Sequence, residues 1–121
     1  MNFFWVGLGG FVGAVARYSS YLLIARFWSH AFPLATLLIN ALACLLAGFL
    51  IGVVETRSPS PQLVLLIGMG FLGSYSTFST LAVESFALVE TREWMFFALN
   101  LVLSLTLGIA AVFLGRLWAV S

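Results

Sequence analysis

The sequence contains very little charge: only 7% of its 121 residues are charged, and the basic residues are five arginines with no lysine. Soluble domains carry about 25% charged residues. Together with a hydrophobic content of 63%, this scarcity excludes an ordinary soluble domain and indicates an integral membrane protein surrounded by lipid. Without a basic cluster, we expect no nucleic acid partner.

Cysteine and histidine each occur once, as Cys44 and His30. A single cysteine forms no intramolecular disulfide, and Cys44 is interpreted as a small packing residue in an apolar run. The sequence shows no metal-ligand cluster, nucleophile–base pair or phosphate-binding loop. We therefore expect that the protein is not an enzyme.

Long apolar segments account for nearly the whole chain. A membrane-spanning helix needs about 20 residues, so we predict an all-α membrane protein with a single domain over residues 1–121. It would have four transmembrane helices, at residues 3–24, 34–54, 62–89 and 94–118. The four tryptophans lie near the ends of these segments, as interfacial tryptophans do.

The third segment is too long for one simple helix, and its middle has an unusual composition. Residues 68–80 contain three glycines and six hydroxyl residues. Irregular main chain at membrane depth is tolerated only against protein or a hydrated cavity. We predict a broken helix here, whose freed carbonyl groups around Gly73 to Ser76 are suited to a cation such as Na⁺.

The arginines give no preferred orientation across the membrane. Arg26 and Arg92 belong to one side of a four-span topology, and Arg57 and Arg116 belong to the other. The positive-inside rule therefore favours neither orientation. We infer insertion in both orientations and antiparallel pairing, because four short helices also enclose little interior.

Several polar or aromatic residues within the spans have two open interpretations. Arg17 either extends to the nearer interface or attracts anions at a water-filled entrance. Asn40 either forms a helix–helix hydrogen bond or donates to a dehydrated anion. Phe78 is either a packing residue or an anion contact through its positive ring edge. Glu84 is either functional, paired with an arginine, or located at an interface.

Three motifs in order resemble the Fluc/CrcB family of small fluoride channels. Residues 9–18, GGFVGAVARY, are similar to the family pattern GGxxGAxxRY in the first helix. Residues 33–40, PLATLLIN, resemble the second-helix signature TLxxN. Residues 70–80, GFLGSYSTFST, match the third-helix pattern GFxGxxTTFST, and Glu84 follows. The resemblance covers essentially the whole chain.

The resemblance implies a fold, a function and a set of site residues. The protein would be an antiparallel, dual-topology homodimer in the bacterial plasma (inner) membrane. It would export cytoplasmic fluoride passively and so relieve fluoride toxicity. The carbonyls of Gly73 and Ser76 would bind a structural Na⁺ at the dimer interface. Fluoride would follow a pathway formed by Thr36, Asn40, Phe78, Ser79, Thr80, Glu84 and Ser104, with Arg17 at a vestibule.

Two positions depart from the family pattern. Leu81 stands where the family usually has a second phenylalanine, and a leucine has no positive ring edge. Phe86 is the candidate replacement. Ser76 replaces the more usual threonine, a mild change because the expected Na⁺ ligand is the main-chain carbonyl.

The alternative from another class is a small multidrug-type, proton-coupled exporter, which also has four helices and dual topology. Export of that kind needs a carboxylate in the first span. Here the first span contains Arg17 and no acid, which disfavours a cationic substrate. A subunit that only packs against a partner would not explain the hydroxyl groups around Phe78. The sequence leaves open whether the partner is a second copy or a paralogous subunit.

Overall fold

The computed structural model describes residues 1–121, and its regular structure is entirely helical. The elements are α1 (Asn2–Ala25), α2 (Leu34–Arg57), α3 (Pro61–Val64), η1 (Leu65–Leu72), α4 (Gly73–Tyr75), α5 (Phe78–Glu90) and α6 (Trp94–Val120). Four helical segments are long and apolar enough to cross a membrane, and α3 through α5 together form the third. The predicted four-span, all-α architecture is confirmed.

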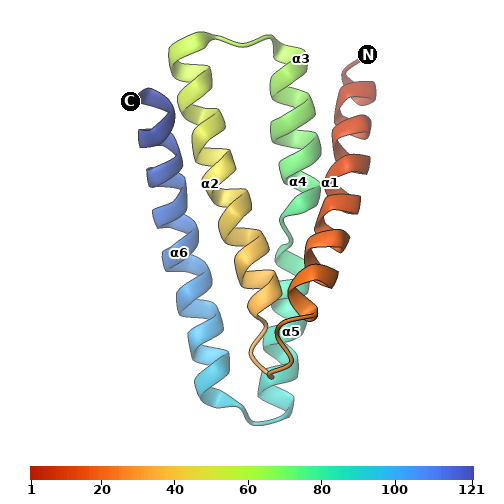
Figure 1. Cartoon of the computed structure of the whole chain (residues 1–121), viewed down its shortest axis with the longest axis vertical. Coiled ribbons are helices and arrows are strands. Elements are labelled where there is room, and N and C mark those ends of the chain that lie inside the picture. Colours follow the sequence, from red (N-terminus) through yellow and green to blue (C-terminus); the bar gives the residue numbers. More distant parts are fainter.

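The spans alternate in direction, so both termini and the α2–α3 loop lie at one end of the molecule (Figure 1). The α1–α2 and α5–α6 loops lie at the other end. The most extensive contacts are those of α2 with α6 and of α1 with η1. The chain therefore forms two closely packed helix pairs that meet in its middle.

Glycines allow both pairs to pack backbone against backbone. A Cβ atom added at Gly9 would overlap the Leu66 carbonyl oxygen in η1, and one added at Gly115 would overlap the Leu45 carbonyl oxygen in α2. Small residues at such positions let helices approach closely in lipid, where association depends on packing. The small-residue face of the first span is therefore the surface that contacts the third.

Polarity is distributed for a lipid solvent. Asn100 and Thr36 have exposed fractions of 0% and 1%, whereas Phe3 and Phe78 are 94% and 80% exposed. Backbone and side-chain polar groups must be satisfied within the protein when hydrocarbon surrounds it. The most deeply buried polar side chains thus lie between helices, and many large apolar side chains cover the outside.

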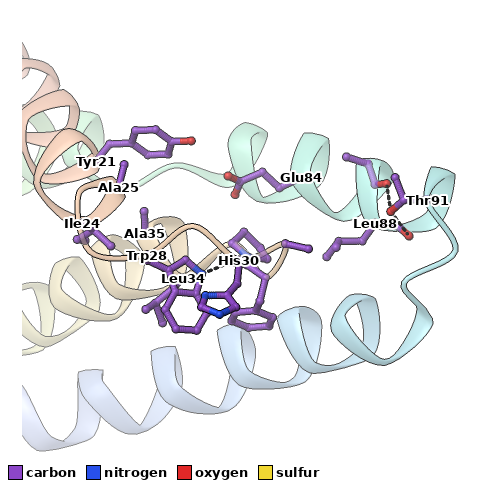
Figure 2. Close-up of a pocket in the computed structure, with 14 residues that line it drawn as sticks. Tyr21, Ile24, Ala25, Trp28, His30, Leu34, Ala35, Glu84, Leu88 and Thr91 are labelled. Carbon is purple, nitrogen blue, oxygen red and sulfur yellow. Dashed lines mark hydrogen bonds between the residues drawn. The ribbon is translucent and has the colours of Figure 1, made fainter.

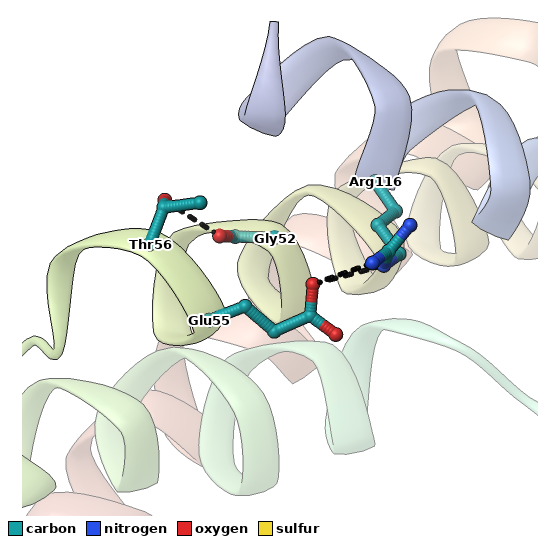
Figure 3. Close-up of polar contacts among 4 residues, drawn as sticks. All are labelled: Gly52, Glu55, Thr56 and Arg116. Atoms are coloured by element: carbon teal, nitrogen blue, oxygen red, sulfur yellow. Dashed lines mark hydrogen bonds and ion pairs between the residues drawn. The ribbon is translucent and has the colours of Figure 1, made fainter.

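Polar contacts close the end that carries the termini. Arg116 of α6 donates through Nε and Nη2 to Glu55 Oε2 of α2, each at 2.9 Å (Figure 3). Thr56 on the same turn donates to the Gly52 carbonyl at 2.8 Å. Both members of the ion pair are nearly half exposed, so this contact orients the helix ends more than it stabilises the fold.

Candidate functional site

The helical backbone of the third span is interrupted at Ser76 and Thr77. Ser76 has φ −76° and ψ 157°, and Thr77 has φ −150° and ψ 114°, so both residues are extended. The segment before them, η1, has the wide π-helical hydrogen-bonding pattern, which is frequent at functional sites. The flanking α-helical pieces are short: α3 has four residues and α4 has three. The interruption therefore follows a stretch that is already irregular.

Asn40 of α2 pairs with both main-chain groups of Thr77. Its Nδ2 donates to the Thr77 carbonyl at 3.0 Å, and its Oδ1 accepts from the Thr77 N–H at 2.8 Å. The amide thus replaces the backbone partner that the extended residue lacks, as buried polar groups require. Of the Asn40 donors, one N–H remains without a partner in the chain.

Thr77 also starts the next helix. Its side-chain oxygen accepts from the Thr80 N–H at 3.2 Å and donates to Thr80 Oγ1 at 2.9 Å. This is the usual N-cap interaction of a threonine. Phe78 and Ser79 follow on the exposed side of the first turn of α5. The capped helix start therefore presents an aromatic ring and a hydroxyl together, away from the chain's own interior.

The interruption leaves main-chain carbonyl groups free. In a continuous helix the Thr77 N–H would bond to the Gly73 carbonyl, but here it bonds to Asn40. The Ser76 carbonyl accepts no hydrogen bond within the chain, while the Ser76 hydroxyl donates to the Leu72 carbonyl at 2.9 Å. The Gly73 and Ser76 oxygens are therefore available as ligands, and carbonyl oxygens of unwound helices are a ligand type that Na⁺ uses.

Tyr75 fixes this region to α1. It is buried, its hydroxyl lies 2.8 Å from Ser20 Oγ, and its ring stacks on Phe71 with centroids 5.5 Å apart. A buried aromatic with a satisfied hydroxyl provides a large packing contribution at no polar cost. The sequence does not indicate this contact, because a serine and a tyrosine 55 residues apart share no helix face.

Glu84 faces a pocket of about 320 Å³ between the α1–α2 loop and α5 (Figure 2). Tyr21, Trp28, His30 and Thr91 also line this pocket. The Glu84 carboxyl lies beside the Thr36 side chain of α2, and its Oε1 is buried without a hydrogen-bond partner. Thr36 and Glu84 therefore form a polar contact beside a mainly apolar pocket on the loop side of Asn40.

A second polar contact lies behind this region, between α5 and α6. Asn100 Nδ2 donates to Ser85 Oγ at 2.9 Å, and both side chains are buried. The Asn100 Oδ1 and the Ser104 Oγ atoms are buried without partners. The interval of four between Asn100 and Ser104 indicates a shared helix face in the sequence, but nothing in the sequence indicated Ser85 as the partner.

The remaining predicted site residue, Arg17, lies apart from these clusters. It is half-buried on α1, and it forms no ion pair with any acid of the chain. The structure thus brings Asn40, Thr77 and Thr80 together at the interruption. It brings Thr36 and Glu84 together at the pocket, and it places Ser104 one turn beyond Asn100 on α6.

These features define a class: a multi-span membrane protein with an interrupted helix and polar side chains sequestered between its spans. The sequence matches the family described as "CrcB-like protein, Camphor Resistance (CrcB)" over residues 4–116. The chain belongs to this family.

Curated relatives have the name "Fluoride-specific ion channel FluC". One from Nitratidesulfovibrio vulgaris is 43% identical over 111 residues, covering 91% of this chain and 90% of the relative. One from a Shewanella species is 39% identical over 115 residues, covering 95% and 93%. One from Bacillus cereus is 46% identical over 90 residues, covering 74% and 66%. The resemblance inferred from the three motifs is confirmed, and the named relatives are channels, a non-enzyme class.

Proposed function

We propose that this protein is a fluoride-selective channel that lets cytoplasmic fluoride leave the cell passively and thereby relieves its toxicity. The observation that carries the proposal is the interruption at Thr77, held by Asn40, beside an exposed Phe78. The names of the relatives supply the substrate. No step of this function needs an energy source, because fluoride would move down its own gradient.

The chemistry of the site suits a small anion. A dehydrated fluoride ion needs donors in place of its water shell, and Asn40 retains one N–H for that purpose. The Phe78 ring, on the residue that follows Thr77, offers a positive edge. Ser79, Thr80, Thr36 and Ser104 would supply hydroxyl groups along the way, with Glu84 lining the pocket and Arg17 attracting anions toward a vestibule.

Leu81 removes one of the two phenylalanine rings that the family usually has near the start of α5. Phe86, the candidate replacement, lies eight residues from Phe78, about 12 Å along α5. That separation is too large for both rings of one subunit to contact the same ion. We infer that each subunit contributes a single ring edge, and that Asn40 and hydroxyl groups supply the remaining contacts.

A dimer of two oppositely oriented copies would complete the pathway. Three features support it: the even distribution of arginines over the two sides, the exposure of Phe78, and the small interior of one chain. In such a dimer the free Gly73 and Ser76 carbonyls of both subunits would hold one structural Na⁺. The bound ion would fix the two interrupted helices against each other and offset repulsion between anions. The bacterial inner membrane is the expected location.

The test is ion efflux from liposomes that contain the purified protein. We expect rapid fluoride efflux, negligible chloride efflux and no dependence on a proton gradient. Efflux of lipophilic cations coupled to protons would instead identify a multidrug-type exporter and contradict the proposal. The Na⁺ site has a separate readout: replacing Na⁺ with a large organic cation should lower the unfolding temperature of the detergent-solubilised dimer, since a ligand stabilises the state that binds it.

A further inference from the structure

Asn100 is the most completely buried polar side chain of the protein, with an exposed fraction of 0%. Its Nδ2 donates a hydrogen bond to Ser85 Oγ at 2.9 Å, but its Oδ1 has no hydrogen-bond partner. A buried polar atom that loses its hydrogen bond costs about 1–3 kcal/mol. Membrane spans avoid such a cost unless another group satisfies the atom. This oxygen therefore indicates an occupant that the chain itself does not provide.

A second unpartnered atom lies on the same face of α6. The buried Ser104 Oγ also lacks a partner, and Ser104 follows Asn100 by four residues on α6. The two positions are about 6 Å apart along the helix axis and lie on one face of α6. That spacing equals about two hydrogen bonds of 2.8 Å. One small molecule can contact both atoms.

The chemistry of the two atoms selects the occupant. Asn100 Oδ1 is an acceptor only, so it repels a bare anion and requires a donor. The Ser104 hydroxyl can donate or accept. A water molecule satisfies both, because it donates one hydrogen, accepts one hydrogen bond and keeps a second hydrogen available. Fluoride in direct contact with Oδ1 would be unfavourable.

We propose that Asn100 and Ser104 hold a resident water molecule between α5 and α6, and that this water donates its second hydrogen to fluoride. The inference rests on the proposed function, and it adds a bound water to the proposed pathway. In this arrangement Asn100 acts as a positioning residue. Its Oδ1 holds the water, and the second hydrogen of the water is the donor that contacts the anion. In the structure Ser85 Oγ accepts from Nδ2, which leaves Oδ1 available to the water.

The test uses Asn100→Leu, which removes both polar atoms at similar volume, together with Ser104→Ala and the double variant. We expect each single change to slow fluoride efflux from liposomes, by about tenfold for Asn100→Leu, since the donor is lost. The double variant should be no slower than Asn100→Leu, because both changes remove the same water. Additive losses, or efflux within twofold of the unchanged protein, would overturn the proposal.

Two further variants separate this role from folding. Asn100→Ser keeps an oxygen that can accept from water, so it should restore most of the efflux, and it remains informative if Asn100→Leu does not form the native protein. Thr106→Val is the matched control on α6, because the Thr106 hydroxyl is exposed and bonds only to its own helix at Val102. This control should leave efflux unchanged. Failure of Asn100→Ser to restore efflux would count against a water-holding role.

A high-resolution crystal structure gives the direct readout. Density for a water within hydrogen-bonding distance of Asn100 Oδ1 and Ser104 Oγ is expected, and its disappearance in Asn100→Leu would support the assignment. Closed packing at this position, with no density, would refute it. If the unchanged protein shows no fluoride efflux, the proposed function fails, while the water density still decides the binding site by itself.

Discussion

Asn40→Asp is the most informative change that this structure offers, because it replaces an amide by a carboxylate of nearly the same shape. Asn40 bonds to the Thr77 N–H through Oδ1 and to the Thr77 carbonyl through Nδ2. An aspartate retains the first bond, at 2.8 Å. It loses the second and places a carboxylate oxygen against the carbonyl oxygen, where the donor had been 3.0 Å away. The donor proposed for fluoride also disappears.

The expected loss of fluoride flux is large. The missing hydrogen bond costs about 1–2 kcal/mol between spans. A fixed negative charge about 4 Å from a passing anion adds about 4 kcal/mol of repulsion at an effective dielectric constant of 20. Each 1.36 kcal/mol corresponds to a factor of ten in rate. Fluoride efflux should therefore fall by roughly a thousandfold or more, while the proposed dimer remains intact.

Initial fluoride efflux from liposomes, followed with a fluoride electrode, measures this loss directly. Thr56→Asp is the matched control: it adds the same charge to α2, but 16 residues away, about 24 Å along the helix. That variant should retain normal efflux. Acidifying both sides of the membrane should return part of the flux to Asn40→Asp, since a protonated carboxyl regains a donor. Efflux of Asn40→Asp within tenfold of the unchanged protein would refute the role of Asn40.

Three other predictions follow from contacts of single residues. Gly13→Ala should prevent α1 from packing on η1, since the added Cβ would overlap the Phe71 carbonyl, whereas Gly7→Ala, with open space around it, should leave the unfolding temperature in detergent unchanged. Phe78→Ile should lower fluoride efflux at least tenfold, with little change in that temperature, because the ring is 80% exposed in the chain; normal efflux would exclude the ring edge as an anion contact. Glu55→Gln should change the free energy of unfolding by less than about 1 kcal/mol, since its ion pair is exposed; a larger change in a chemical unfolding titration would contradict this view.

The four spans could be predicted from the sequence because lipid imposes one simple requirement, a long apolar run. The predicted ends agree with the structure to within three residues. The polar positions Thr36, Asn40 and Ser104 were recognisable for the same reason, as rare exceptions within apolar segments. Glycine content and hydroxyl content also marked residues 68–80 as different from a plain helix.

The partners of these polar residues could not be predicted. Asn40 bonds to the main chain of Thr77, and the identity of residue 77 has no influence on main-chain groups that every non-proline residue carries. Asn100 bonds to Ser85 through the packing of α5 on α6, which depends on the angle between two helices. Sequence spacing describes one helix face at a time. It contains no information on which two faces meet.

The pairing of the helices also has a consequence for biosynthesis. The surface of α1 that carries Gly9 and Gly13 finds its partner in η1, so this pair can close as soon as the third span has been synthesised. The corresponding surface of α2 packs against α6, the final helix of the chain, which has 27 residues. This pair can close only after α6 has been synthesised. Until then, the groove at Gly48 and Gly52 faces lipid. A ribosome that stops before α6 therefore leaves an inserted but unclosed intermediate, whose α2 surface is free for another helix.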